Sequence, residues 1–428
     1  MTSASSNSYS DSDQPVIVCT GPFGSGATTA AKWLEEAHGY HRINVSGEIR
    51  KEWLARYGDE QPMRSDLQHL GDELRQEEGA AALVDRALSN VTFELTDPIV
   101  IDSVKNVGEI YTLRRRFGYR LLILAVLSDI SERTKRVLPH YDNLGLGQNH
   151  LLDDDQRDRN EEVPYGQQVE LCIDLADVII LNNSGGSEQN FRDKLDDLVG
   201  LINGTRRRAL TQTEIYMHSA YSMAKSSKCL KRHVGAVLVD PRGQLIAAGY
   251  NENPAMTKPC AEEDLYNRQC HRDIVRNRHF LELARRGAEC PVCGSEITQV
   301  EGPPWRCAAC YKDGRRTDLE VFYFPDRAMN WCTAVHAEVR AILTAGDRVR
   351  DCALYTTTFP CMQCAEALAE AGISKVVYTE AYPDPYGAAR LNIAQIPVEQ
   401  FEGVRSSVVE RLFPNSWQPK PWFGADRS

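Results

Sequence analysis

The chain has 428 residues, which is enough for two or three domains. Its composition, 42% hydrophobic and 25% charged, is ordinary for a globular protein, and a formal net charge of −11 argues against general coating of nucleic acid. Residues 1–14 carry no basic segment and no apolar run, so they predict a disordered tail rather than a signal peptide. The longest apolar run, residues 121–127, is too short to cross a bilayer, so we expect no membrane partner.

Cysteine is abundant, with 13 residues. Six of them form three C-x-x-C pairs, Cys290/Cys293, Cys307/Cys310 and Cys361/Cys364. Without an export signal, this spacing indicates metal binding rather than disulfides. We therefore expect a cytoplasmic, metal-binding protein.

The first part of the chain predicts a parallel α/β domain over residues 15–204. Short apolar segments alternate with helical stretches, as such a sheet requires. The predicted strands are residues 15–20, 99–102, 121–127 and 177–182. The first strand leads through a glycine-rich turn into a helix predicted over residues 28–37, which is the context of a phosphate-binding loop (P-loop).

That turn, GPFGSGATT at residues 21–29, lacks one residue of a complete P-loop. The glycines are correctly spaced and Thr28 supplies the hydroxyl, but Ala27 stands where the pattern has lysine. We expect nucleotide binding by Gly21, Gly24, Ser25, Gly26, Ala27 and Thr28, with Asp102 holding magnesium beside Thr28.

Losing the lysine should impair phosphate transfer more than binding. Backbone N–H groups at the start of a helix hold phosphate without a side chain, whereas the lysine stabilises the transition state. Lys32 lies five residues on, about 140° around the helix, so it cannot replace the lysine. Arg133 or Arg136, on a predicted lid, is the alternative source of charge. The sequence therefore predicts a domain that senses nucleotide, with ATP and Mg²⁺ as the candidate ligands, and does not transfer phosphate.

The composition changes after residue 204, and a second α/β domain is predicted over residues 205–428. Its expected strands are residues 234–239, 245–248, 353–356 and 376–378, and its expected helices are 211–225, 336–345 and 362–371. Residues of about 257–330 are polar and rich in Cys, Pro and Gly, so we interpret them as an insertion. Within it, Cys290, Cys293, Cys307 and Cys310 have the spacing of a closed four-cysteine zinc ribbon, which predicts a structural zinc.

The strongest chemical signal is His336-Ala337-Glu338 followed by Pro360-Cys361-Met362-Gln363-Cys364. His336, Cys361 and Cys364 offer three ligands to a tetrahedral Zn²⁺ and leave the fourth position for water. Glu338 is then the general acid and base, because it stands beside a ligand without being needed as one. The order resembles the H-x-E…P-C-x-x-C signature of zinc nucleobase deaminases. The alternatives are a structural zinc, or a buried histidine beside an unrelated C-x-x-C.

Two stretches resemble the deoxycytidylate deaminases over most of residues 211–405: MHSAYSMAKSSKCLKRHVGAVLVDPRGQLIAAGYNENP and YTTTFPCMQCAEALAEAGISKVVY. The resemblance implies that Asn251 contacts the sugar and that Ala337 presents its backbone to the base. The basic residues Lys228, Lys231, Arg232 and His233 bind phosphate on this interpretation, or form a solvated charged face on the alternative one.

The first domain resembles small nucleotide kinases over most of residues 15–200. The motifs in order are GPFGSGATT, SGEIRKEW, RSDLQHLGDELRQEEG, VIDSVKNVGEI and ADVIILNNSG. The alternative is a domain that keeps the fold and has lost nucleotide binding.

Together, the two domains resemble the bacterial anti-phage dCTP deaminases. That resemblance implies conversion of dCTP to dUTP and of dCMP to dUMP, restraint until infection, a regulatory RNA and homo-oligomers. Two other functions stay open: a nucleic-acid (tRNA or single-stranded DNA) cytidine deaminase, against which the acidic balance argues, and a zinc- and nucleotide-binding regulator, in which Glu338 would have no purpose.

Overall fold

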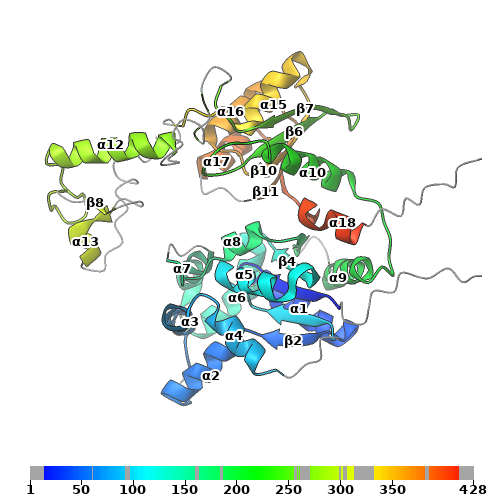
Figure 1. The fold of residues 1–428 in the computed structure, drawn as a ribbon, viewed down its shortest axis with the longest axis vertical. Helices are drawn as coiled ribbons and strands as arrows, with labels where there is room; N and C mark the ends of the chain where they lie inside the picture. The colour runs from blue at the N-terminus through cyan, green and yellow to red at the C-terminus, as the bar shows by residue number, and fades with distance from the viewer. Residues whose placement is uncertain are drawn as a thin grey trace, which may run out of the picture. The chain divides into compact units, whose positions relative to one another are not determined.

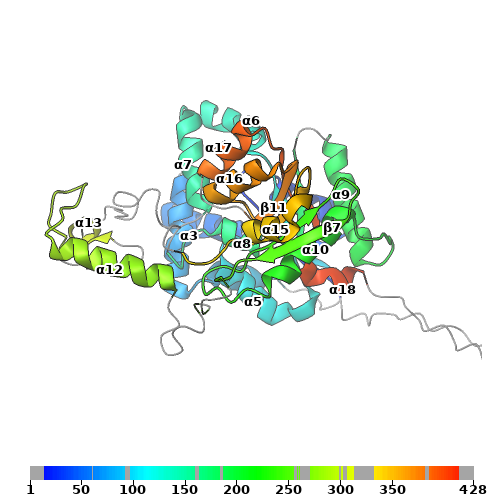
Figure 2. The same ribbon diagram turned by 90° about the horizontal axis from the view of Figure 1, so that it is seen from above.

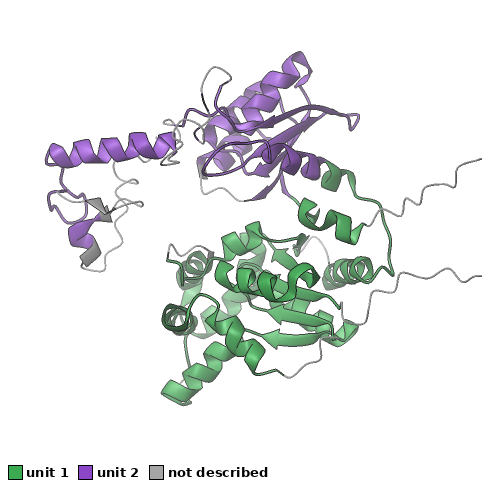
Figure 3. Ribbon diagram, in the orientation of Figure 1, with its two compact units in different colours: residues 1–215, 401–428 green, residues 216–400 purple. Residues whose placement is uncertain are grey.

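The computed structural model divides the chain into two compact units, residues 1–215 with 401–428, and residues 216–400 (Figure 3). The described residues are 14–59, 61–91, 97–159, 163–183, 187–254, 258, 260, 270–297, 300–301, 306–312, 332–380 and 385–413. The predicted tail therefore falls almost wholly outside them, as does much of the predicted insertion. No helix in the described part of the chain is long and apolar enough to cross a membrane.

The first unit contains a six-stranded sheet in the order β13-β5-β4-β1-β3-β2. All neighbouring strands are parallel except β13, which is antiparallel to β5. The strands are β1 (Val16–Thr20), β2 (His41–Asn44), β3 (Ile99–Asp102), β4 (Leu121–Leu127), β5 (Val178–Leu181) and β13 (Gly403–Val404). Continuous apolar runs such as LLILAVL are fully buried, as expected of strands covered on both faces.

Helices follow most of these strands (Figure 1). They are α1 (Ala27–His38), α2 (Ser46–Tyr57), α3 (Arg64–Glu78), α4 (Ala82–Ser89), α5 (Val107–Phe117), α6 (Ile130–Asn143), α7 (Gly147–Arg159), α8 (Val169–Asp174), α9 (Glu188–Ile202) and α18 (Val409–Leu412). Leu34 of α1, Phe191 of α9 and Leu412 of α18 share one buried core with β1, β4 and β5. These helices therefore cover one face of the sheet.

The C-terminal segment belongs to the first unit, which corrects the prediction that residues 205–428 form the second domain. Gly403 and Val404 pair with Ile179 and Val178 of β5, and the backbone N–H of Val404 donates to Glu214 at 2.9 Å. The segment returns because it completes the apolar core described above. The short apolar pattern around residues 403–404 does not reveal in the sequence that this segment pairs with β5.

The second unit contains a five-stranded sheet in the order β12-β11-β10-β6-β7. β10, β11 and β12 are parallel to one another, whereas β6 is antiparallel to both β10 and β7. The strands are β6 (Gly235–Val239), β7 (Leu245–Tyr250), β10 (Ala353–Thr358), β11 (Lys375–Glu380) and β12 (Val398–Gln400). The helices are α10 (Gln212–Ala224), which starts in the first unit, α15 (Ala337–Ala345), α16 (Met362–Ala371) and α17 (Pro385–Ile393).

The helices of this unit lie on both faces of its sheet (Figure 2). Ala341 of α15, Leu368 of α16 and Leu391 of α17 share a core with β6, β10 and β11. On the opposite face, a Cβ atom at Gly235 would lie 1.9 Å from the carbonyl oxygen of Ala220, so α10 contacts β6 through bare backbone. The sheet with these two layers carries the predicted zinc ligands at the starts of α15 and α16.

The described part of the insertion consists of α12 (His271–Arg285), β8 (Val300–Glu301), β9 (Arg306–Cys307) and α13 (Ala308–Lys312). β8 and β9 pair in an antiparallel arrangement. Phe280 of α12 is fully buried against Cys290, Ile297, Cys307 and Cys310, so the cysteines form the centre of a small separate core.

Candidate active site

The three predicted zinc ligands lie together at the starts of two helices. His336 immediately precedes α15, Cys361 immediately precedes α16, and Cys364 lies in the first turn of α16. His336 Nδ1 lies 3.1 Å from Cys364 Sγ and 3.4 Å from Cys361 Sγ. One ring nitrogen and two sulfurs around one point form the donor set of a catalytic zinc site, which leaves one position open. The hydrogen bond between the two thiols lowers the pKa of Cys361 to about 4 and raises the pKa of Cys364, so Cys361 is the thiolate of the pair before a metal binds.

Glu338 lies in the first turn of α15, beside these ligands. Its side chain is buried, and its Oε2 is 3.5 Å from Cys364 Sγ. Burial raises the pKa of the Glu338 carboxyl because the low-polarity surroundings disfavour its charged form. The carboxyl is therefore placed next to the metal position without belonging to the three converging ligands.

Two glycines let backbone approach the site closely. A Cβ at Gly249 of β7 would lie 2.2 Å from the carbonyl oxygen of Ala337, and one at Gly387 of α17 would lie 2.3 Å from that of Pro360. Contacts this short exclude a side chain, so α15 and the Pro360 segment are each fixed against bare backbone. Just before His336, Val335 exchanges two backbone hydrogen bonds with Glu252, at 2.9 and 3.2 Å.

The two predicted substrate-contact residues are both buried. Ala337 is the first residue of α15, and its side chain belongs to the core of the unit. Asn251 Oδ1 accepts a hydrogen bond from the backbone N–H of Val234 at 2.8 Å, and its Nδ2 donates to the carbonyl of Arg232 at 2.8 Å. In this structure Asn251 therefore holds the end of the basic segment 228–233.

The cations of that segment have partners in the fold. Lys231 forms an ion pair with Asp273 of α12, and Arg232 Nη2 lies 3.2 Å from Glu380 Oε2. Glu380 also accepts hydrogen bonds from Tyr221 at 3.3 Å and from Thr358 at 3.2 Å. Glu380 thus joins the basic segment to the end of β10, which leads into Cys361.

The four cysteines of the predicted ribbon also converge. The Sγ atoms of Cys290 and Cys310 are 3.8 Å apart, and those of Cys293 and Cys307 are 3.6 Å apart. All four ligand atoms lie within 4.8 Å of one another. A regular tetrahedron with Zn–S bonds of roughly 2.3 Å places its sulfurs about 3.8 Å apart, so the residues fit a four-thiolate zinc.

Four further cysteines outside the two predicted zinc sites lie near one another. Burial raises the pKa of the Cys260 and Cys332 thiols, and Cys229 and Cys270 are close enough to raise both further. Among the described residues, the groups whose ligand atoms converge within 4.8 Å do not include these four.

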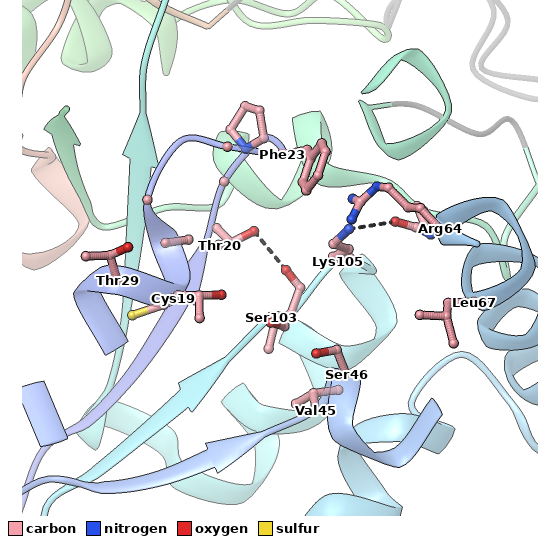
Figure 4. A pocket seen from close by; sticks show the side chains of 18 of the residues that line it. Cys19, Thr20, Phe23, Thr29, Val45, Ser46, Arg64, Leu67, Ser103 and Lys105 are labelled. Atoms are coloured by element: carbon pink, nitrogen blue, oxygen red, sulfur yellow. Dashed lines mark hydrogen bonds between the residues drawn. The ribbon is translucent and has the colours of Figure 1, made fainter. Parts of the chain in front are cut away.

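The glycine loop of the first unit borders a cavity of about 690 Å³ (Figure 4). Gly24 and Gly26 have φ angles of 76° and 105°, which a side chain would strain, and α1 begins directly at Ala27. Thr28 Oγ1 donates to Asp102 Oδ1 at 3.1 Å, so the structure brings this pair together. It also places Arg42 Nη2 2.7 Å from Asp102 Oδ2, a contact that the sequence did not suggest.

The sequence predicted only two candidate cations near the loop, Arg133 and Arg136. Arg136 lines the cavity, whereas Arg133 is buried and paired with Asp155. Arg64 and Lys105 also line it, and Figure 4 shows both side chains extending toward the Phe23 side of the space. Neither had been assigned a role, because the loop motif contains only the residues that follow β1.

Comparison with known proteins agrees with the converging ligands. Residues 210–380 match the family model described as the cytidine and deoxycytidylate deaminase zinc-binding region. The fold and site therefore define a zinc-binding deaminase-type domain.

Individual relatives show which of the deaminase families this chain belongs to. The deoxycytidylate deaminase of Enterobacteria phage T4 is 31% identical over 38% of this chain and 75% of its own length. That of Schizosaccharomyces pombe is 24% identical over 92% of this chain and 99% of its own length, and that of Homo sapiens is 25% identical over 46% and 83%. The chain belongs to the deoxycytidylate deaminase family. Because the yeast match covers nearly all of both chains, it extends across both units.

Proposed function

We propose that this protein catalyses the hydrolytic deamination of free deoxycytidine nucleotides, dCTP as well as dCMP. The observation that carries the proposal is the convergence of His336, Cys361 and Cys364 on one point with the buried Glu338 carboxyl beside it. Two thiolates and an imidazole hold zinc, and a carboxylate outside the ligand set is what proton transfer to a base requires.

In this mechanism, His336, Cys361 and Cys364 would hold zinc, which would make a bound water a better nucleophile near neutral pH. Glu338 takes the proton that the attacking water loses and delivers it to the ring nitrogen of cytosine. The same carboxyl then takes the proton of the hydroxyl now attached to the ring carbon and delivers it to the amino group, which leaves as ammonia. The water oxygen becomes the carbonyl oxygen of uracil, so one ammonia is released for each deoxyuridine nucleotide formed.

Burial suits Glu338 to this cycle. A carboxyl shielded from water has its pKa raised toward the working pH, so one group can both accept and donate a proton. The short backbone contacts at Gly249 and Gly387 support the mechanism because they fix the starts of α15 and α16, which carry all four residues.

For the substrate phosphates, the basic segment 228–233 is the candidate binding surface. Arg232 is held near the end of β10 by Glu380, and Lys231 is held by Asp273. The ribbon cysteines fit a second, structural zinc, which we propose stabilises the insertion. The resemblance to anti-phage dCTP deaminases further suggests depletion of dCTP during infection, control by an RNA and assembly into homo-oligomers.

The test is to incubate the purified full chain separately with dCMP, dCTP, a cytosine-containing single-stranded DNA and a tRNA, and to measure ammonia. We expect ammonia from the free nucleotides alone. Release from DNA or tRNA with none from dCMP or dCTP would instead establish the nucleic-acid deaminase. No ammonia from any substrate, with zinc bound at His336, Cys361 and Cys364, would favour the non-enzymatic regulator.

A further inference from the structure

The cavity beside the glycine loop is a second site, formed entirely within the first unit. Five cationic side chains and one carboxylate, Glu188, are among its lining residues; the cations are Arg50, Arg64, Arg75, Lys105 and Arg136. Its volume of about 690 Å³ lies within the range of small-molecule sites. The N–H groups of the first turn of α1 have no partners within the helix and face an anion favourably.

The expected magnesium position is already neutralised by a protein cation. Asp102 is fully buried, and its Oδ2 accepts hydrogen bonds from Arg42 at 2.7 Å (Nη2) and 3.3 Å (Nε). Its Oδ1 accepts from Thr28 at 3.1 Å and from Ser103 at 3.2 Å. A divalent ion held by Thr28 and Asp102 would have to share one carboxylate with a guanidinium, which like-charge repulsion disfavours.

Positive charge reaches the cavity from elsewhere. Arg136 donates to the carbonyl of Gly24 at 3.2 Å, to that of Asn182 at 2.6 Å and to Ser128 Oγ at 3.2 Å. These acceptors are all neutral, and no carboxylate pairs with Arg136 in the described part of the chain. Its full charge therefore lies directly at the edge of the loop.

On the opposite wall, two cations share a single buried carboxylate. Lys105 Nζ is 2.7 Å from Asp158, which Arg64 also contacts. The Arg64 guanidinium lies 3.6 Å from the centre of the Phe23 ring, which fixes it above the loop. One positive charge is left over from this group, so the cavity suits an anion.

A buried polar atom also lacks a partner here. Gln68 is 3% exposed and lines the cavity, and its Nε2 donates to Asp158 Oδ1 at 2.5 Å. Among the described residues, no group donates a hydrogen bond to its Oε1. An unsatisfied buried acceptor is costly, so it suits a ligand that carries a hydrogen-bond donor, such as the amino group of a nucleobase or a hydroxyl group.

We propose that this cavity binds a nucleoside phosphate without a divalent cation. Arg136 and the Arg64–Lys105 pair supply the charge that a P-loop lysine and magnesium supply elsewhere, and Gln68 accepts a hydrogen bond from the base. The site binds its ligand without transferring phosphate, because neither the lysine nor the metal is present to stabilise a phosphoryl-transfer transition state. This inference concerns a site separate from the zinc site and does not depend on deamination.

The experiment measures binding of ATP, dGTP and dTTP to the full chain by calorimetry, once with EDTA and once with excess MgCl₂. None of these probes carries a cytosine, so the zinc site does not consume them. We expect at least one to bind in EDTA, with a Kd within about three-fold of the value in MgCl₂. Arg136→Met and Lys105→Met should each weaken binding about ten-fold or more. Lys135→Met is the matched control on the same helix, because Lys135 is exposed and pairs with Glu132.

Arg42→Gln sharpens the test, because it frees Asp102 and should make binding tighter in MgCl₂ than in EDTA. The proposal is overturned if no probe binds in EDTA, if binding requires Mg²⁺ in the unaltered protein, or if Arg136→Met and Lys105→Met bind as tightly as the control. Binding of a 5′-triphosphorylated RNA with no free nucleotide bound would also overturn it. The same samples are assayed for ammonia release from dCMP, so a failure at the zinc site is detected separately.

Discussion

The zinc site and the glycine-loop cavity balance their charges in different ways. At the zinc site, two thiols and an imidazole converge on one point with a carboxyl beside them, which is a donor set suited to a metal ion. Beside the cavity, two buried acids already have protein cations: Asp102 pairs with Arg42, and Asp158 pairs with Arg64 and Lys105. The comparison teaches that one site depends on a metal for its structure and its chemistry, whereas the other is complete without one.

The largest expected effect comes from breaking the metal side of this comparison. Cys364→Ser removes a ligand, so it should remove one zinc per chain and lower turnover by at least the ~10²–10⁴-fold that loss of one acid–base group costs. Zinc analysis and dCMP turnover check this. Cys352→Ser is the control, because Cys352 is equally buried in the same unit but donates to the Arg348 carbonyl at 3.2 Å. Full activity in Cys364→Ser would refute the ligand assignment.

The second prediction extends metal dependence to the ribbon. Cys293→Ser should lower the zinc content by one while leaving the catalytic zinc in place, since its cluster is separate. The small core around Phe280 should then open, because it consists largely of the cysteines themselves. Limited proteolysis of residues 271–312 measures the opening. Val292→Ser, at an exposed position between the ligands, should change neither quantity. Unchanged zinc in Cys293→Ser would exclude a metal here.

The third prediction concerns a substitution, Asp158→Asn, that disturbs the internal charge balance of the first unit. Burial alone would raise the pKa of Asp158, but Lys105 and Arg64 outweigh it and hold that pKa below its ordinary value. Its stabilising contribution is therefore complete above the unfolded pKa of about 3.9 and is lost as pH falls through the lower folded value. Asp158→Asn should cost about 3–5 kcal/mol at pH 7 and remove this acid-dependent loss.

Hydrogen exchange of α3 and α7 at pH 7 and at acid pH measures that effect. The control is Asp153→Asn. Both residues lie on α7, but Asp153 is exposed whereas Asp158 is buried. Equal protection in the two variants at pH 7 would contradict internal charge balance as the source of stability.

The smallest predicted effect concerns backbone contact at the zinc site. Gly249→Ala places a methyl group 2.2 Å from the Ala337 carbonyl, so α15 must move, at a cost of about 1–3 kcal/mol. Turnover of dCMP should fall because His336 and Glu338 move with α15. Gly47→Ala is the control, since its methyl would meet nothing closer than 3.7 Å. Thermal unfolding and turnover that match this control would show that the close contact is unimportant.

Local patterns predicted much of both folds. The strands at residues 99–102 and 121–127 have the predicted bounds, because buried parallel strands are continuous apolar runs. β2, with the sequence HRIN, was missed because only Ile43 is buried. β13 was missed because two residues carry no pattern, and their pairing with β5 depends on contacts more than 200 positions away in sequence.

The two sites also differed in how far the sequence could predict them. The zinc ligands lie in two short motifs that specify both residue types and helix starts, so their convergence was predictable. The cavity is lined by Arg64 of α3, Lys105 after β3 and Arg136 of α6, which are remote in sequence, and Arg42 of β2 pairs with Asp102 beside the loop. Only folding of the sheet brings them together, so the loop motif alone predicted a magnesium position where the structure has an arginine.

The central claim is tested most directly by measuring zinc content and ammonia release together in Glu338→Gln. Glutamine keeps the size and hydrogen-bonding shape of the side chain but cannot carry protons. With dCMP as substrate, we predict unchanged zinc and a turnover at least ~10²–10⁴-fold below that of the unaltered chain, with Glu370→Gln on the exposed side of α16 as the fully active control. Near-normal ammonia release from Glu338→Gln with its zinc in place would contradict the account.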